Sequence, residues 1–219
     1  KYAIATTPSL GLTASKSLMG GNLKAVAAGL TVERPPFPAL TNVAAEVSQV
    51  QNILGGIKIL DRDFTINRLE KELQTNNFPI VHLATHGKFG ADAASTFLVV
   101  YDAKISLDQL DNLLRSVSQN SGRREQQPVE LLTLSACQTA AGDNRAALGI
   151  AGVAVRAGVK SALASLWFIN DEATVKFIEE FYTQLRQPNM TKAEALKQAQ
   201  LKLIASEDYN HPAVWSPFI

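Results

Sequence analysis

Short apolar runs alternate with helical patterns along most of this 219-residue chain. Strands that alternate with helices form parallel sheets covered on both faces, so the pattern predicts an α/β fold with a mostly parallel sheet sandwiched between helices. Five apolar runs predict buried strands, at residues 24–30, 57–60, 79–85, 129–138 and 159–167. A further strand is predicted at residues 2–6, and a small hairpin at residues 97–101 and 104–105.

Residues that favour helix N-caps precede most of the helical patterns. Ser106 with Gln109, and Thr191 with Glu194, have the spacing of capping boxes. The predicted helices follow Thr41, Thr65, Ser106, Asp171 and Thr191; the first ends at Gly55-Gly56, the last runs to about Ser206, and a small-residue helix covers 148–157. Between these elements we expect an extended linker at 35–38, a turn at His86-Gly87, an exposed loop at 118–127 and an irregular end at 211–218.

His86 and Cys137 each follow one of the predicted buried strands, 51 residues apart. The carboxyl ends of parallel strands meet at one edge of an open α/β sheet, where catalytic groups gather. An imidazole and a thiol at one edge suit a cysteine hydrolase. The alternative is that Cys137 is a small buried apolar residue and His86 belongs to a strand-ending turn. His82, deeper in the same run, is interpreted as a core histidine bonded to the backbone.

The same two segments also offer an oxyanion site. Gly87 has no side chain, so a substrate carbonyl can approach its N–H closely, and the N–H of Cys137 is the natural second donor. Other nucleophile schemes fail, because the sequence contains no Gly-x-Ser-x-Gly elbow. Ser135 shares a strand face with Cys137, but no base is assigned to it.

Composition limits the other function classes. Hydrophobic residues make up 46% and charged residues 19%, which is typical of one globular domain, and the net charge of +1 gives no reason to expect nucleic acid or an anionic membrane as partner. One cysteine forms no internal disulfide, and no spacing recommends a metal site; no glycine-rich phosphate loop recommends a cofactor. The single cysteine is compatible with a reducing compartment and favours the cytoplasm without fixing it.

The chain shows no apolar run that could span a bilayer and no signal peptide, and it begins without Met. We therefore interpret the chain as a fragment of a longer polypeptide, with any targeting signal further upstream.

The sequence resembles the CHAT domain, a caspase-like peptidase family often attached to tetratricopeptide repeats. The residues that carry the resemblance span nearly the whole chain: Tyr2-Ala3-Ile4 to Pro8-Ser9-Leu10, Ile80-Val81-His82-Leu83-Ala84-Thr85-His86-Gly87, Leu134-Ser135-Ala136-Cys137-Gln138-Thr139, Ala157-Gly158, Ser165-Leu166-Trp167, Asn170-Asp171-Glu172-Ala173-Thr174 and Pro212-Ala213-Val214-Trp215. The opening segment matches an internal stretch of such domains, so the resemblance implies a single domain over residues 1–219 that lacks its first part. The resemblance implies a caspase-like fold and a regulated endopeptidase that cleaves protein or peptide substrates. It places His86 and Cys137 on the catalytic dyad, and it implies an upstream sensor region or partner protein.

In caspase-like folds the residue two before the nucleophile and the strand after it help to form the first specificity pocket, which here implies Ser135, Ser165 and Trp167. Asp143 and Asp171 could supply a carboxylate to this pocket, although a turn and a helix cap respectively are the simpler roles. The segment after Cys137 is short, which argues against activation by linker cleavage. The remaining alternative function is a non-catalytic interaction module on the same scaffold.

Overall fold

The structure is a computed structural model. It describes residues 3, 23–89, 96–119, 128–135, 138–139, 157–165, 167 and 171–219, without the side chains of 89, 116–119, 138–139 and 171. Several predictions lie outside the described residues: the strand at 2–6, most of the helix at 148–157, and the positions of Cys137 and Asp143.

The main sheet has five strands, all parallel, in the order β2-β1-β3-β7-β9. They are β1 (Ala25–Gly29), β2 (Gly56–Leu60), β3 (Ile80–Ala84), β7 (Leu131–Ser135) and β9 (Ala162–Ala164). β1 and β3 are buried at every residue and the other inner strand, β7, at all but its last. This burial agrees with their near-continuous apolar sequences, because a parallel sheet is covered on both faces. The five predicted main strands and the α/β class are confirmed, although β7 and β9 are shorter than the predicted runs 129–138 and 159–167.

A second sheet continues two of these strands beyond their carboxyl ends. It consists of β4 (Gly87–Phe89), β5 (Phe97–Val99), β6 (Lys104–Ser106) and β8 (Gln138–Thr139), in the order β6-β5-β4-β8. The predicted hairpin is confirmed as the antiparallel pair β5–β6. The predicted turn at His86-Gly87 is wrong, because the N–H of Val99 donates to the His86 carbonyl and holds this stretch extended into β4.

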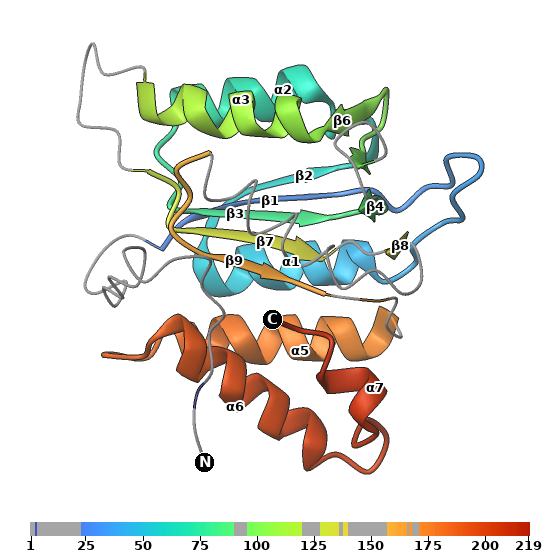
Figure 1. The fold of residues 1–219 in the computed structure, drawn as a ribbon, viewed down its shortest axis with the longest axis vertical. Helices are drawn as coiled ribbons and strands as arrows, with labels where there is room; N and C mark the ends of the chain where they lie inside the picture. The colour runs from blue at the N-terminus through green and yellow to red at the C-terminus, as the bar shows by residue number, and fades with distance from the viewer. Residues whose placement is uncertain are drawn as a thin grey trace.

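Helices cover both faces of the main sheet (Figure 1). On one face lie α2 (Ile66–Thr75) and α3 (Leu107–Gln119), and on the other lie α1 (Val43–Leu54), α5 (Asp171–Leu185) and α6 (Lys192–Ile204). A 3-10 turn, η2 (Asp61–Asp63), and a short helix, α7 (Pro212–Trp215), complete the named elements. Each face has its own apolar core, one centred on residues such as Phe64 and Leu83, the other on Val47 and Phe177.

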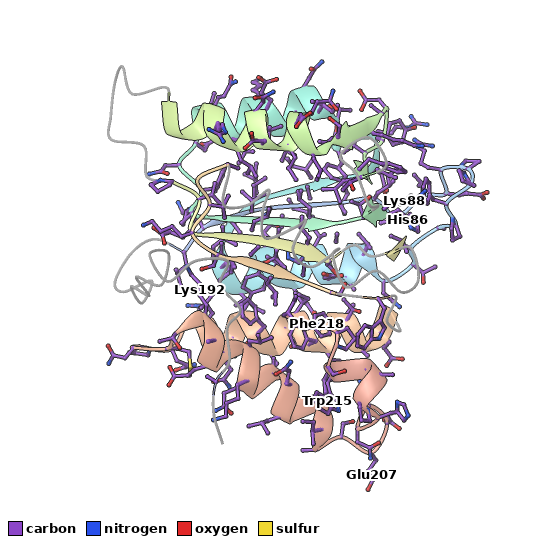
Figure 2. The ribbon with its side chains drawn as sticks, in the orientation of Figure 1. His86, Lys88, Lys192, Glu207, Trp215 and Phe218 are labelled. Atoms are coloured by element: carbon purple, nitrogen blue, oxygen red, sulfur yellow. The ribbon has the colours of Figure 1, made fainter. Side chains whose placement is uncertain are left out.

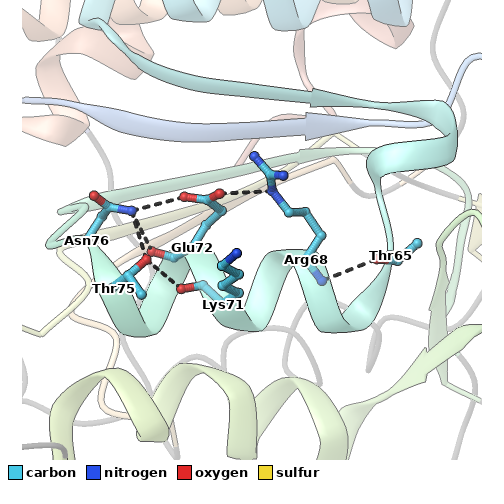
Figure 3. Close-up of polar contacts among 6 residues, drawn as sticks. All are labelled: Thr65, Arg68, Lys71, Glu72, Thr75 and Asn76. Atoms are coloured by element: carbon cyan, nitrogen blue, oxygen red, sulfur yellow. Dashed lines mark hydrogen bonds and ion pairs between the residues drawn. The ribbon is translucent and has the colours of Figure 1, made fainter.

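Three of the predicted helix caps are confirmed. The Thr65 hydroxyl accepts from the Arg68 N–H at 3.2 Å and starts α2, whose surface carries an Arg68–Glu72 ion pair of 2.9 Å (Figure 3). Ser106 with Gln109, and Thr191 with Glu194, form the predicted reciprocal bonds.

The Thr41 cap is wrong. The N-cap of α1 is Asn42, which makes no side-chain cap bond because its backbone already has helical angles, φ −95° and ψ −6°.

Four boundaries differ from the predictions. Part of the loop predicted at 118–127 is helical, because α3 extends to Gln119. Helix α5 begins at Asp171 itself rather than after it, and α6 ends at Ile204 rather than near Ser206. The end of the chain is not irregular throughout, since His211 accepts from the Ala213 N–H at 3.2 Å and starts α7. Capping by a histidine ring carries a weak sequence signal, which explains the last error.

Candidate functional site

His86 lies between β3 and β4, where the two sheets meet, and its side chain is 8% exposed. Its ring nitrogen Nε2 lies 2.7 Å from the carbonyl oxygen of Pro38. A carbonyl only accepts hydrogen bonds, so Nε2 carries the proton in this contact. The other ring nitrogen, Nδ1, then holds the lone pair, and it has no hydrogen-bonding partner among the described residues. The hydrogen bond to Pro38 therefore orients the ring, and within the described surroundings Nδ1 is the unbonded nitrogen.

The Pro38 carbonyl is held by the loop between β1 and α1. Arg34 and Phe37 exchange two backbone hydrogen bonds, of 2.9 and 2.7 Å, that close this loop. The Arg34 guanidinium donates to the carbonyl of Tyr101 at 2.9 Å and lies 3.7 Å from the centre of its ring. Hydrogen bonds from Arg34 and then Arg62 lower the pKa of the Tyr101 phenol. The sequence marks this loop only as a rigid linker, because a backbone carbonyl partner has no residue signature.

The Phe37 ring packs against the His86 ring, with 5.1 Å between ring centres. It also meets Phe97 of β5 edge-on at 6.2 Å. The Lys104 ammonium lies 4.3 Å from the centre of the Phe97 ring. Figure 2 shows His86 together with Lys88 at this end of the sheet. The imidazole is therefore fixed by a hydrogen bond at its edge and by an aromatic ring against its face.

The strand register brackets the segment that contains Cys137, which itself lies outside the described residues. On the near side Ala84 pairs with Ser135, and the Thr85 N–H donates to the Ser135 carbonyl at 3.2 Å. On the far side Lys88 pairs with Gln138 in the β4–β8 ladder. The residues just before and just after His86 are therefore paired with the residues just before and just after 136–137.

The remaining predicted site residues occupy different surroundings. Gly87 is buried at the start of β4, and Ser135 is half-buried at the end of β7. Ser165 is buried and pairs antiparallel with Phe218, so the end of the described chain covers the outer edge of β9. Trp167 is 39% exposed, and its indole N–H donates to the Ala213 carbonyl of α7 at 3.0 Å. The Asp171 side chain, like Asp143, is outside the described part.

His82 is a core histidine as expected, with 0% exposure, but the prediction that it bonds to the backbone is wrong. Its partners are side chains: Nδ1 lies 3.2 Å from the Tyr182 hydroxyl and Nε2 lies 3.0 Å from the Glu46 carboxylate. The backbone of β3 is occupied by its own ladder, so the ring turns toward α1 and α5. A signal was present in the sequence, since Glu46 falls on the apolar stripe of α1 with Val43, Val47 and Val50.

The opposite end of the sheet holds a different polar cluster (Figure 2). The Lys192 ammonium donates to the Glu130 carbonyl at 2.8 Å and to the Ser161 hydroxyl at 3.0 Å. Burial lowers the pKa of Lys192, and the nearby Glu130 carboxylate opposes this shift. These contacts fasten the start of α6 to the amino ends of the strands, away from His86.

Within the described ranges, no group of three His, Cys, Asp or Glu residues is placed to hold a metal ion. The helices in the part of the chain that the structure describes are all too short or too polar to cross a membrane.

Comparison with known proteins gives one result. A search of curated protein sequences finds no match. The family model of the CHAT domain matches residues 1–219, the whole chain. The five-stranded parallel sheet between helices is the α/β arrangement of this caspase-like family. The chain therefore belongs to the CHAT domain family.

Proposed function

We propose that this domain is a regulated cysteine endopeptidase in which Cys137 is the nucleophile and His86 the acid–base group. The observation that carries the proposal is the state of the His86 ring. Its Nε2–H is bonded to the Pro38 carbonyl at 2.7 Å, which orients the ring, and Nδ1 has no hydrogen-bonding partner among the described residues. A histidine with one nitrogen anchored and one available is arranged as general bases are in nucleophilic catalysis. A purely structural histidine would be expected to place both nitrogens against polar side chains, as His82 does.

The strand register supports the position proposed for Cys137. In the β3–β7 ladder every residue lies beside the one 51 positions later, as Ala84 lies beside Ser135. In the β4–β8 ladder the offset is 50, as Lys88 lies beside Gln138. Continuing the first ladder by two residues pairs His86 with Cys137. The change of offset must be absorbed close to the same point, and such irregularities in strand pairing often re-aim side chains near active sites.

The proposed reaction follows ordinary thiol chemistry. Nδ1 of His86 first takes the proton of the Cys137 thiol. The resulting thiolate attacks the carbonyl carbon of a peptide bond, and Nδ1 gives that proton to the departing amine as the C–N bond breaks. The product is a thioester on Cys137 and a free amine. Water then attacks the thioester, and Nδ1 takes one of its protons. Release of the carboxylic acid restores the thiolate and the protonated His86.

Gly87 is well placed to help bind the oxyanion formed in both steps. Strand β4 pairs antiparallel with β5, and the His86 carbonyl accepts from the Val99 N–H. In such a pair successive residues direct their backbone groups to opposite sides. The Gly87 N–H therefore points away from β5, toward the side on which β8 lies. With the Cys137 N–H it completes the proposed pair of donors.

We propose peptides or proteins as substrates, bound near the carboxyl ends of β7 and β9. Ser135 ends β7, Ser165 follows β9, and Trp167 presents an exposed ring beyond β9. An upstream sensor region or a partner protein is proposed to control the reaction, as the family resemblance implies. Asp143 and Asp171 stay candidates for a carboxylate in the first pocket.

The test is intact-mass analysis after exposure to a panel of peptidyl electrophiles. We expect one adduct, on Cys137, whose yield depends on the peptide sequence. Cys137→Ala removes the labelled atom, and His86→Ala slows labelling at neutral pH because the imidazole no longer favours the thiolate. His211→Asn is the matched control, because it changes a distant histidine and keeps a side chain able to cap α7.

Two outcomes would contradict the proposal. Labelling that ignores the peptide sequence and is unchanged in His86→Ala would mean that Cys137 is an ordinary thiol. Absence of labelling both in this chain and in the full-length protein with its activating partner would favour the non-catalytic interaction module.

A further inference from the structure

Four buried polar side chains form a chain of contacts across the core of the main sheet. Glu46 of α1 meets His82 of β3, with 3.0 Å between Oε1 and Nε2. His82 Nδ1 lies 3.2 Å from the hydroxyl of Tyr182 on α5, which donates to the Thr133 hydroxyl of β7 at 2.7 Å. None of the four is more than 3% exposed. We call these four residues the core polar chain.

The direction of the hydrogen bonds in the core polar chain can be assigned by starting from the Tyr182 hydroxyl. Burial raises the pKa of Tyr182 far above its ordinary value, so its hydroxyl keeps a proton and donates it to Thr133. The Tyr182 oxygen then accepts from the Nδ1–H of His82. On the other side, His82 Nε2 and Glu46 Oε1 lie 3.0 Å apart, and neither atom has another polar contact among the described residues. Each contact in the core polar chain therefore needs the polar side chains of both residues that make it.

The core polar chain joins the two strands that lead to the proposed dyad. His82 and Thr133 are direct partners in the β3–β7 ladder, and the single hydroxyl of Tyr182 contacts both. His82 lies four residues before His86, and Thr133 lies four residues before Cys137. The register of the first pair continues to Ala84 and Ser135, the last paired residues before the proposed dyad.

Apolar patterning alone specifies this register poorly. β3 reads Ile-Val-His-Leu-Ala and β7 reads Leu-Leu-Thr-Leu-Ser, and both are buried on two faces. Normally a slip of one residue moves apolar side chains to the solvent face and is penalised. Here a slipped strand would still bury apolar side chains on both faces. A slip would leave the polar residues inside the two strands without hydrogen-bonding partners. Unpaired buried polar groups are strongly disfavoured.

We propose that the core polar chain is a register lock, which holds β3 and β7 in the alignment that pairs Ala84 with Ser135, directly before the proposed dyad. Tyr182 and Glu46 are then positioning residues for the dyad, although neither touches the reacting atoms. The alignment itself is independent of any activity, and only its catalytic consequence rests on the proposed function.

The test uses the single native cysteine as a reporter of alignment. In the full chain carrying His86→Cys, the two thiols are equilibrated with reduced and oxidised glutathione. Oxidised glutathione takes two electrons, two glutathione thiols are released, and one intramolecular disulfide forms. The disulfide needs Cα atoms within about 7 Å, so its equilibrium constant reports how well positions 86 and 137 are held together. Peptide mapping by mass spectrometry measures its yield.

We expect Tyr182→Phe in this background to lower the equilibrium constant about tenfold, because the phenyl ring fills the same space without joining His82 to Thr133. Thr133→Val should act in the same direction, and it serves if Tyr182→Phe does not fold. Thr133→Ser keeps the hydroxyl and should restore the parent value. The matched control is Ile178→Val, which trims a buried apolar side chain one turn earlier on α5. It should lower the melting temperature without changing the disulfide equilibrium.

A second readout uses the chain with His86 intact. Tyr182→Phe should shift the pH dependence of Cys137 alkylation by iodoacetamide toward that of an isolated thiol, and Ile178→Val should leave it unchanged. Two results would overturn the register lock: a parent disulfide no more stable than in the denatured chain, or one unaffected by both Tyr182→Phe and Thr133→Val. If the disulfide responds as expected but peptidyl electrophiles fail to label Cys137 selectively, the lock stands and the proposed peptidase falls.

Discussion

His82 and His86 lie on one stretch of chain, four residues apart, in regions that differ in almost every physical respect. The core around His82 is closed, and both ring nitrogens face polar side chains. The strand end around His86 is bounded by a loop carbonyl and an aromatic ring, and one nitrogen is left free within the described surroundings.

The difference teaches that burial alone does not identify a catalytic histidine, because both rings are less than a tenth exposed. The two histidines differ in how many of their ring nitrogens lie against a polar group, and in whether that group is a side chain or a backbone carbonyl. A ring with two side-chain partners contributes to the core, whereas a ring held by one backbone carbonyl is oriented and still able to exchange a proton. The predictions below test this contrast.

The largest expected effect is on the stability of the core. His82→Ala removes the partner of the buried Glu46 carboxyl and leaves a cavity, so we expect the free energy of unfolding to fall by about 3–5 kcal/mol. Urea unfolding at pH 7 measures it. The exposed cap His211→Ala is the control and should cost about 1 kcal/mol. A loss as small as that of the control would show that the core histidine is dispensable.

The comparison sharpens when both members of the buried pair are replaced. Glu46→Leu combined with His82→Leu removes both polar partners together, and replacing a whole buried pair by apolar residues is often close to neutral. The double variant should therefore be more stable than His82→Leu alone. If the two single losses simply add, Glu46 and His82 are not coupled.

A substitution at His86 should reduce stability only slightly and the rate of the proposed reaction strongly. His86→Gln removes one hydrogen bond to the Pro38 carbonyl and part of a ring contact, so we expect a stability loss of about 1–2 kcal/mol. The peptidase rate on the best peptide from the electrophile panel should fall at least about 100-fold, because general acid–base groups contribute about 10²–10⁴. Steady-state kinetics with parallel urea unfolding checks both. A rate loss no greater than the fraction unfolded would place His86 with His82 as a structural residue.

The sequence predicts much of the framework of both regions, for one physical reason. Fully buried parallel strands must be apolar along their whole length, so β1, β3 and β7 are visible as apolar runs. The starts of helices α2, α3 and α6 can be predicted from their capping residues. The first backbone N–H groups of a helix have no partner within the helix and need a side-chain acceptor. His86 stood out because it closes one of these runs.

The features that the sequence does not predict are those that depend on backbone atoms or on contacts between residues distant in the sequence. Nothing in the residue types around Pro38 shows that its carbonyl meets a ring 48 residues later. Gly87 has the character of a turn, yet it begins β4 because β5 is available to pair with it. The His82 partners come from α1 and α5, and only Glu46 on an apolar helix stripe hinted at one of them.

The core polar chain should also make the protein sensitive to alkali. An unfolded tyrosine loses its proton near pH 10, while burial raises the pKa of Tyr182 well above that. Above pH 10 the folded state thus binds more protons than the unfolded state, and the free energy of unfolding falls by about 1.4 kcal/mol per pH unit. Tyr182→Phe should remove this slope in urea unfolding between pH 9 and 11.

Other groups titrate in this range, so the difference between the two proteins is the informative quantity. Lys192 contributes the opposite sign, because burial lowers its pKa and its folded form releases its proton first. Lys192 is unchanged in both proteins, and its contribution cancels. Equal slopes in the wild type and Tyr182→Phe would mean that the hydroxyl is not kept protonated by the core.

The smallest expected effect concerns how the His86 ring is held. Phe37→Leu keeps an apolar side chain over the ring but removes the flat aromatic face that lies 5.1 Å from it. We expect a stability loss of about 1 kcal/mol, as for one aromatic pair, and a fall in peptidase rate of about threefold to tenfold with little change in KM. Phe177→Leu is the matched control, because it breaks a 3.5 Å stack with Phe218 on the other face of the sheet. If the two variants lose stability equally and only Phe37→Leu loses rate, orientation of the free nitrogen at the strand end matters beyond folding. Equal effects on rate would instead attribute the loss to general loosening of the domain, and the contrast between the two histidines would then rest on the Pro38 carbonyl alone.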